Sequence, residues 1–162
     1  MFDKDKLKNI KLLVYDFDGV MTDNKVYIDQ NGNEFVQVNR ADGLAISEIK
    51  KLLIDQIIIS TEKNSVVLLR AKKLGIKCFH AVDNKKEKLI RYCESNNLKL
   101  TNVAFVGNDI NDLDALSIVG FSLCPSDAHD KIKKISNYIL NSKGGDGVIR
   151  ELFDLINDKN KF

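Results

Sequence analysis

Short apolar runs without polar alternation are the feature of this 162-residue chain that most limits its possible folds. A strand with one wet face alternates apolar and polar residues, whereas a parallel strand covered on both faces stays apolar throughout. Six runs have this character, the third and sixth more weakly: residues 10–15, 57–59, 78–79, 103–106, 121–123 and 138–140. They predict buried strands of a parallel sheet.

Segments with helical spacing separate these runs, with apolar residues three or four positions apart in residues 44–53, 66–74, 89–93 and 148–156. This alternation predicts a Rossmann-like three-layer α/β/α fold with a mostly parallel sheet. Residues 25–38 break the rhythm, because two β-rich stretches surround an Asn-Gly pair, which indicates a hairpin inserted after the first strand. We therefore expect a single domain over residues 1–162, with a C-terminal tail from about residue 143 and no separate cap domain.

Composition excludes several classes of protein. With 25 Lys and Arg against 23 Asp and Glu, the net charge of +2 gives no bulk electrostatic basis for binding nucleic acid or a membrane surface. No apolar run approaches the roughly 18 residues of a membrane span, and the N-terminus lacks a signal-peptide core. The three cysteines form no C-x-x-C pair. A cytoplasmic protein with reduced thiols is expected.

The first apolar run ends in two carboxylates, Asp16 and Asp18, followed by Gly19. Ligands of open α/β sheets bind beyond the carboxyl ends of the strands, so these residues lie where a site is expected. Their spacing of two directs both to the same side of the strand end. The alternative is a solvated turn in which Asp23 serves as a cap.

A second polar cluster follows the run at residues 103–106 and contains Asn108, Asp109, Asn111 and Asp112. Carboxylate and amide oxygens suit a hard cation such as Mg²⁺. The alternative is a capped helix start with Asn111 or Asp112 as the N-cap, and both roles are compatible.

Two further candidates are weaker when taken alone. Ser60 ends the run at residues 57–59, where a hydroxyl near the start of the next helix can donate to a phosphate oxygen. Lys85 lies in a lysine-rich stretch, and composition does not distinguish it from Lys86 or Lys88. Ordinary capping and a solvated charged face are the alternatives.

The order Asp-x-Asp, hydroxyl, lysine and acidic loop resembles the four motifs of the haloacid dehalogenase superfamily of phosphohydrolases, over nearly the whole chain. The segments that carry a closer resemblance are DFDGVMTD, NGNEF, ADGLAI, RAKKLGI, VGNDIND and KGGDGVIRE. They are similar to the subfamily that dephosphorylates 3-deoxy-2-keto sugar acids, either octulosonate 8-phosphate or nonulosonate (acylneuraminate) 9-phosphates.

This resemblance implies a role for each motif. Asp16 is the nucleophile that forms an aspartyl-phosphate, and Asp18 is the general acid and base. Ser60 donates to a phosphoryl oxygen, and Lys85 orients the nucleophile. Mg²⁺ is the implied cofactor, bound by Asp16, by the backbone carbonyl of Asp18 and by the loop from Asn108 to Asp112.

One position departs from the family pattern, because Asn108 stands where the family has a metal-binding aspartate. Asn108 brings no charge, and Asp109 or Asp112 is expected to compensate. The Gly-Asn loop is also similar to the phosphatase-like domain of acylneuraminate cytidylyltransferases. A catalytically weak or silent module that supports oligomerisation is therefore a second hypothesis. A receiver-like phospho-acceptor domain is a third, but receivers place the acceptor aspartate in their third strand.

Residues for substrate binding are also suggested by resemblance. Glu62, Arg70 and Lys73 align with specificity residues of nonulosonate 9-phosphate phosphatases, which favours a nine-carbon acid, and Arg150 is a further candidate. Surface charge is the alternative for Glu62, Arg70 and Lys73, and a flexible linker is the alternative for the glycine-rich segment that ends at Arg150. The resemblance implies a homotetramer in which neighbouring subunits complete the site. His129 is expected to cap a helix rather than to take part in catalysis.

Overall fold

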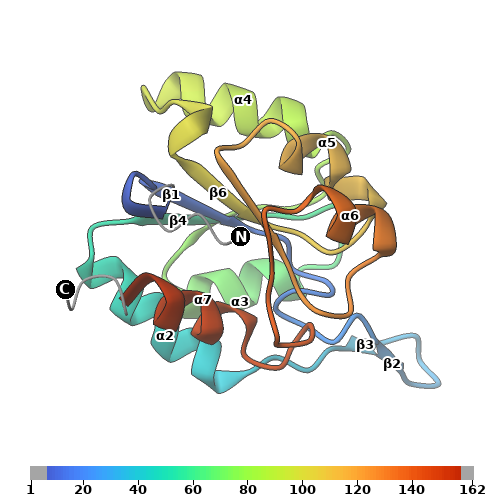
Figure 1. Cartoon of the computed structure of the whole chain (residues 1–162). Helices are drawn as coiled ribbons and strands as arrows, with labels where there is room; N and C mark the ends of the chain where they lie inside the picture. The colour runs from blue at the N-terminus through green and yellow to red at the C-terminus, as the bar shows by residue number, and fades with distance from the viewer. Residues whose placement is uncertain (1–6, 158–162) are drawn as a thin grey trace.

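The computed structural model describes residues 7–157, and a six-stranded sheet forms its middle layer (Figure 1). The strands are β1 (Leu12–Tyr15), β4 (Asp55–Ile59), β5 (Lys77–Phe79), β6 (Val103–Val106), β7 (Phe121–Cys124) and β8 (Tyr138–Ile139). They lie in the order β5-β4-β1-β6-β7-β8, and every neighbouring pair is parallel. The predicted fold class is confirmed, while residues 1–6 and 158–162 of the predicted domain lie outside the described residues.

Helices cover both faces of this sheet (Figure 1). On one face lie α2 (Arg40–Lys51), α3 (Val66–Leu74) and α7 (Val148–Asn157), and on the other lie α4 (Lys85–Ser95), α5 (Leu113–Leu116) and α6 (Asp130–Ile135). Along β1, Leu13 and Tyr15 join the first core and Leu12 and Val14 join the second. Burial on both faces explains why this strand is apolar throughout. Among residues 7–157, no helix has the length and hydrophobicity to span a bilayer.

Local chemistry sets the helix ends. α3 has the predicted bounds, but α2 begins at Arg40, before the predicted start, because the Asn39 side chain accepts a hydrogen bond from the backbone N–H of Ala41 at 2.8 Å. α2 ends at Lys51 because Leu53, which was predicted to be helical, has a left-handed φ of 59°. His129 caps α6 by accepting from the N–H of Lys131, as expected.

The predicted hairpin is present as β2 (Tyr27–Ile28) and β3 (Glu34–Phe35), which pair antiparallel and project from the sheet (Figure 1). Its strands are shorter than the predicted stretches. The Asp29 carboxylate closes the turn by accepting from the N–H groups of Asn31 and Asn33. The hairpin leaves Tyr27, Ile28 and Phe35 exposed. Within residues 7–157 it is the one insertion of its kind, and no cap domain accompanies it.

Replacing Leu53 with glycine is expected to stabilise the protein. The left-handed conformation costs a residue with a Cβ about 1–2 kcal/mol, and the greater backbone entropy of glycine offsets part of this gain. The Leu53 side chain is 91% exposed, so little packing is lost. Denaturant unfolding should show a gain of about 0.5–1 kcal/mol for Leu53→Gly and almost none for Leu53→Ala. A loss of stability in Leu53→Gly would contradict this account.

Candidate functional site

The central strand of the sheet places the first carboxylate of the site. The chain passes from β1 to β4 and β5 on one side and then to β6, β7 and β8 on the other, so the strand order reverses beside β1. A crevice at the carboxyl ends of the strands is expected at such a reversal. Asp16, the residue after β1, lies there, buried to 4% exposure.

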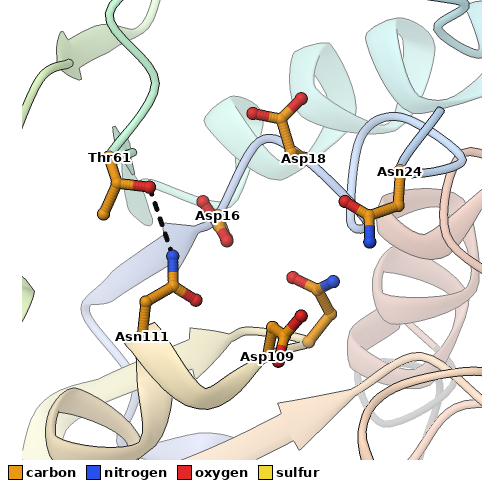
Figure 2. Close-up of a pocket in the computed structure, with 7 residues that line it drawn as sticks. Asp16, Asp18, Asn24, Thr61, Asp109 and Asn111 are labelled. Carbon is orange, nitrogen blue, oxygen red and sulfur yellow. Dashed lines mark hydrogen bonds between the residues drawn. The ribbon is translucent and has the colours of Figure 1, made fainter. Parts of the chain in front are cut away.

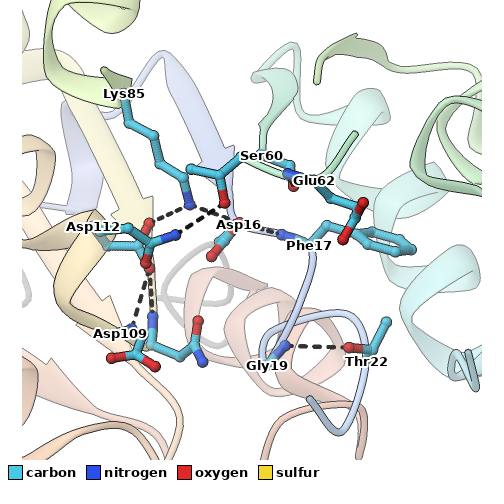
Figure 3. A network of polar contacts seen from close by, with 12 residues as sticks. Asp16, Phe17, Gly19, Thr22, Ser60, Glu62, Lys85, Asp109 and Asp112 are labelled. Atoms are coloured by element: carbon cyan, nitrogen blue, oxygen red, sulfur yellow. Dashed lines mark hydrogen bonds and ion pairs between the residues drawn. The ribbon is translucent and has the colours of Figure 1, made fainter. Parts of the chain in front are cut away.

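Asp16 is held by two donors. Its Oδ1 accepts a hydrogen bond from the N–H of Phe17 at 2.7 Å. The same oxygen forms an ion pair with Lys85 Nζ at 2.8 Å (Figure 3). No hydrogen bond among the described residues reaches Oδ2. This oxygen is therefore the one available to form a new bond.

Lys85 is the lysine of its stretch that reaches the site. It is the first residue of α4, its side chain is buried, and Nζ also contacts Asp112 Oδ1 at 2.6 Å (Figure 3). Lys86 and Lys88 stay partly exposed. The Asn84 side chain starts the helix by accepting from the N–H of Glu87, which directs residue 85 toward the strand ends.

Asp112 organises the second polar loop. Its Oδ2 accepts from the backbone N–H groups of Asn108 at 2.9 Å and Asp109 at 3.3 Å. Asp109 caps the short helix Ile110–Asp112 by accepting from the N–H of Ile110. The predicted Asp112 is the N-cap residue of the next helix, α5, but without a side-chain cap hydrogen bond. The close approach of Asp112 requires Gly107, where a Cβ would lie 2.7 Å from the carboxylate.

Two carboxylates and one ammonium give this cluster a net negative charge in a buried place. Burial and the Asp112 carboxylate raise the pKa of Asp16 to about 8, although Lys85 opposes the shift. The two carboxylates raise the pKa of Lys85 against the effect of burial. Burial and the nearby Glu62 carboxylate also raise the pKa of Asp18. The site therefore favours additional positive charge, supplied by protons or by a cation.

Asn108 provides an oxygen suited to such a cation. Its side chain is buried, and Oδ1 has no hydrogen-bond partner in the described part of the chain. The side chain lies against Gly19, where only a glycine leaves space for it, because a Cβ would lie 1.9 Å from Nδ2. Within residues 7–157, no three acidic, histidine or cysteine side chains gather as a metal site on their own. A metal here would need the amide oxygen of Asn108 and backbone oxygen as well as Asp16.

These groups open onto a pocket of about 380 Å³ (Figure 2). The residues lining it are Asp16, Asp18, Asn24, Thr61, Asn108, Asp109 and Asn111. Asn111 Nδ2 donates to Thr61 Oγ1 at 3.2 Å and links the loops after β4 and β6 across the pocket. Sequence reasoning did not select Asn24 or Thr61. The only sequence signal at Asn24 was its residue type. Asparagine tolerates the left-handed conformation better than most residues, and Asn24 has a φ of 64°.

Ser60 lies beside Asp16 and Lys85 at the end of β4 (Figure 3). It is buried, and its Oγ accepts from the N–H of Glu62 at 3.1 Å. The helix that follows begins at Val66 with Ser65 as its N-cap. Five residues separate Ser60 from that helix start, and its position comes from the strand end.

The predicted substrate residues do not converge within one chain. Glu62 lies near Asp18, whose pKa it affects. Arg70 and Lys73 share a helix face, but this face lines a separate groove of about 520 Å³ against α2. Arg150 lies on α7, with Nε 3.5 Å from Asp154 Oδ1. In a single copy, only Glu62 is placed beside the pocket.

Comparison with known proteins extends over most of the chain. The family model for haloacid dehalogenase-like hydrolases matches residues 2–152. A Yersinia pestis protein named 3-deoxy-D-manno-octulosonate 8-phosphate phosphatase KdsC is 34% identical over 151 residues, which are 91% of this chain and 80% of that protein.

Two solved structures have a similar fold. A Moraxella catarrhalis 3-deoxy-D-manno-octulosonate 8-phosphate phosphatase, in complex with magnesium, phosphate and the sugar acid KDO, has a TM-score of 0.92 and 30% identity, covering 96% of this chain and 90% of its own. The cobalt-bound form of the deoxy-D-mannose-octulosonate 8-phosphate phosphatase YrbI from Haemophilus influenzae has a TM-score of 0.90 and 29% identity, covering 96% of this chain and 92% of its own.

Without divalent metal, the protein is expected to lose stability as the pH rises from 6 to 8. The folded-state pKa of Asp16, about 8, lies above the unfolded value of 3.8, so the folded state binds more protons in this range. The loss is at most about 1.4 kcal/mol per pH unit. Thermal melts of metal-free protein should show this slope, and Asp16→Asn should flatten it. A stability that rises with pH in this range would contradict the prediction.

Proposed function

Because the chain belongs to the haloacid dehalogenase-like hydrolases, we propose that it hydrolyses the phosphate monoester of a 3-deoxy-2-keto sugar acid with Mg²⁺ as cofactor. The observation that carries the proposal is the contact of Lys85 with both Asp16 and Asp112 beneath a pocket that Asn108 also lines. The relatives named as octulosonate 8-phosphate phosphatases support this substrate class.

The residues present fit a hard divalent cation. Asp16, the backbone carbonyl of Asp18 and the unpartnered Asn108 Oδ1 would hold Mg²⁺. When bound, the ion neutralises charge on the phosphoryl oxygens and on the carboxylates around it. Asp112 is fully engaged by Lys85 and two backbone N–H groups, so we assign it to positioning Lys85 rather than to the metal. Asp109, which lines the pocket, is the remaining acidic candidate.

The first step transfers the phosphoryl group to the enzyme. Asp16 Oδ2 attacks phosphorus while the bond to the sugar oxygen breaks, and Asp18 protonates that oxygen as it leaves. The raised pKa of Asp18 favours the protonated form that this step requires. Lys85 keeps Asp16 in place, and Ser60 is positioned to donate to a phosphoryl oxygen.

The second step restores the nucleophile. Asp18, now a carboxylate, removes a proton from a water molecule that attacks phosphorus, and the bond from phosphorus to Asp16 breaks. Inorganic phosphate leaves, and both aspartates regain their starting protonation states. One water molecule is consumed and one sugar acid is released for each phosphate.

Two substrates of this class are candidates. Octulosonate 8-phosphate is supported by the named relatives. A nonulosonate 9-phosphate is favoured by Glu62, which lies near Asp18 where the leaving sugar would be bound. Arg70 and Lys73 line a separate groove, so they would contact a substrate only from a neighbouring subunit, as the expected homotetramer requires.

We expect Mg²⁺-dependent phosphate release from one of these two sugar phosphates. Asp16→Asn should reduce kcat by roughly 10³-fold or more because the nucleophile is lost. Comparing kcat/KM for both substrates, with Mg²⁺ and with chelator, identifies the preferred acid. Absence of turnover on both, in a protein that binds Mg²⁺ and melts cooperatively, would instead favour the silent oligomerisation module.

Asn108→Asp is expected to tighten Mg²⁺ binding roughly tenfold, because a charged ligand replaces a neutral one at short range. Calorimetric titration of Mg²⁺ at pH 8.5 measures the change without reference to activity. Asp109→Asn is the matched control, and it should weaken binding if Asp109 compensates for the missing charge. Unchanged affinity in Asn108→Asp would show that residue 108 is not a ligand.

A further inference from the structure

A buried carboxylate that the proposed chemistry does not use lies in the first turn of α2. Asp42 is 2% exposed, and its Oδ1 accepts hydrogen bonds from the backbone N–H groups of Ile149 and Arg150, both at 3.0 Å. These groups belong to the first turn of α7, which packs against α2 (Figure 1). Asp42 therefore caps a helix about 107 positions away in the sequence.

The environment of Asp42 makes its charge costly. Burial raises its pKa to about 6, with Asp146 adding to the shift and the two N–H groups and Arg70 opposing it. Oδ2 has no hydrogen-bond partner in the described residues. Burial raises the pKa of Tyr15, and the Asp42 carboxylate adds to this shift. A group this poorly solvated adds little net stability, so its contribution is better explained by the geometry that it imposes on α7.

The segment that leads into α7 packs against the catalytic turn at residues 19–23. The N–H of Gly145 donates to the carbonyl of Val20 at 3.0 Å. A Cβ at Gly144 would lie 2.3 Å from the carbonyl oxygen of Gly19, so the backbone of the segment before α7 packs directly against the backbone of the turn. Gly145 also has a φ of 73°, which favours glycine.

The catalytic turn adjoins two groups of the site. It directly follows Asp18, and the Asn108 side chain occupies the space that a Cβ at Gly19 would need, since such a Cβ would lie 1.9 Å from Nδ2. The turn is closed by N–H groups of Met21 and Thr22, which donate to the carbonyl of Phe17, and by the N–H of Gly19, which donates to Thr22 Oγ1 (Figure 3). A continuous series of contacts thus joins Asp42 to the pocket.

We propose that Asp42 is a positioning residue that holds the catalytic turn in place through α7 and the Gly144–Gly145 segment. The effect on turnover rests on the proposed phosphatase function, whereas the structural coupling does not. The acceptor oxygen of Asp42, rather than its charge, carries the role.

The test compares Asp42→Ala, which removes the acceptor, with Asp42→Asn, which retains it. Ser122→Ala is the matched control, because Ser122 is also buried, and its hydroxyl donates to Ile135 and Asn137 rather than to a group of α7 or of the turn. Amide hydrogen exchange followed by NMR reports on Ile149 and Arg150 at the cap and on Met21 and Thr22 in the turn. If Asp42→Ala fails to fold, Asp42→Ser, whose hydroxyl is too short to bridge, replaces it.

In Asp42→Ala, exchange should accelerate about tenfold or more at the cap and also in the turn. The kcat should fall roughly tenfold to 100-fold while KM changes little, because the reacting groups and not the bound sugar are displaced. Asp42→Asn should restore both readouts to within about threefold of the unmodified protein.

Three results would overturn the proposal. They are faster exchange at the cap with unchanged exchange in the turn, equal acceleration of the turn in Ser122→Ala, and no rescue by Asp42→Asn. If the unmodified protein hydrolyses no phosphate monoester, the proposed function fails, and the exchange measurements still decide the coupling.

Discussion

The contact of one ammonium with two carboxylates is the interaction on which the rest of the site depends. Lys85 Nζ lies within 2.8 Å of Asp16 and 2.6 Å of Asp112, with all three side chains nearly inaccessible to water. Removing Lys85 would leave two buried carboxylates without a compensating positive charge. The remaining negative charge favours binding of a cation. Asn108 lines the same pocket, and its neutral amide oxygen could serve as a ligand to that cation.

The sheet topology brings these charges together. Asp16, Ser60 and Asn108 each follow a parallel strand, and β1, β4 and β6 are neighbours, so their carboxyl ends meet at one edge. Lys85 enters from the start of α4. The backbone bonds around Asp112 and the packing of the C-terminal segment against residues 19–23 hold the loops between these elements in a defined geometry. Rigid elements thus position groups that come from four separated segments.

Much of the fold and the centre of the site could be predicted from the sequence, because both leave local patterns. Uninterrupted apolar runs indicate strands buried on two faces, and polar residues directly after them indicate the edge where ligands bind. The places of Arg70, Lys73 and Arg150 could not be predicted in this way. Their helix faces were recognisable, but which cavity a face lines depends on the neighbouring helix.

The sequence by itself determined the α/β architecture, the hairpin insertion and the identity of Asp16, Asp18 and the polar loop from Asn108 to Asp112 as site candidates. Only the tertiary structure decided which lysine is buried, that Asp109 caps the first short helix of the polar loop, and that Asp42 holds α7. The physical reason is the separation of the interacting residues along the sequence. Periodicity and strand ends are set by neighbouring residues, whereas burial, ion pairing and capping across the chain depend on segments that meet only when the protein folds.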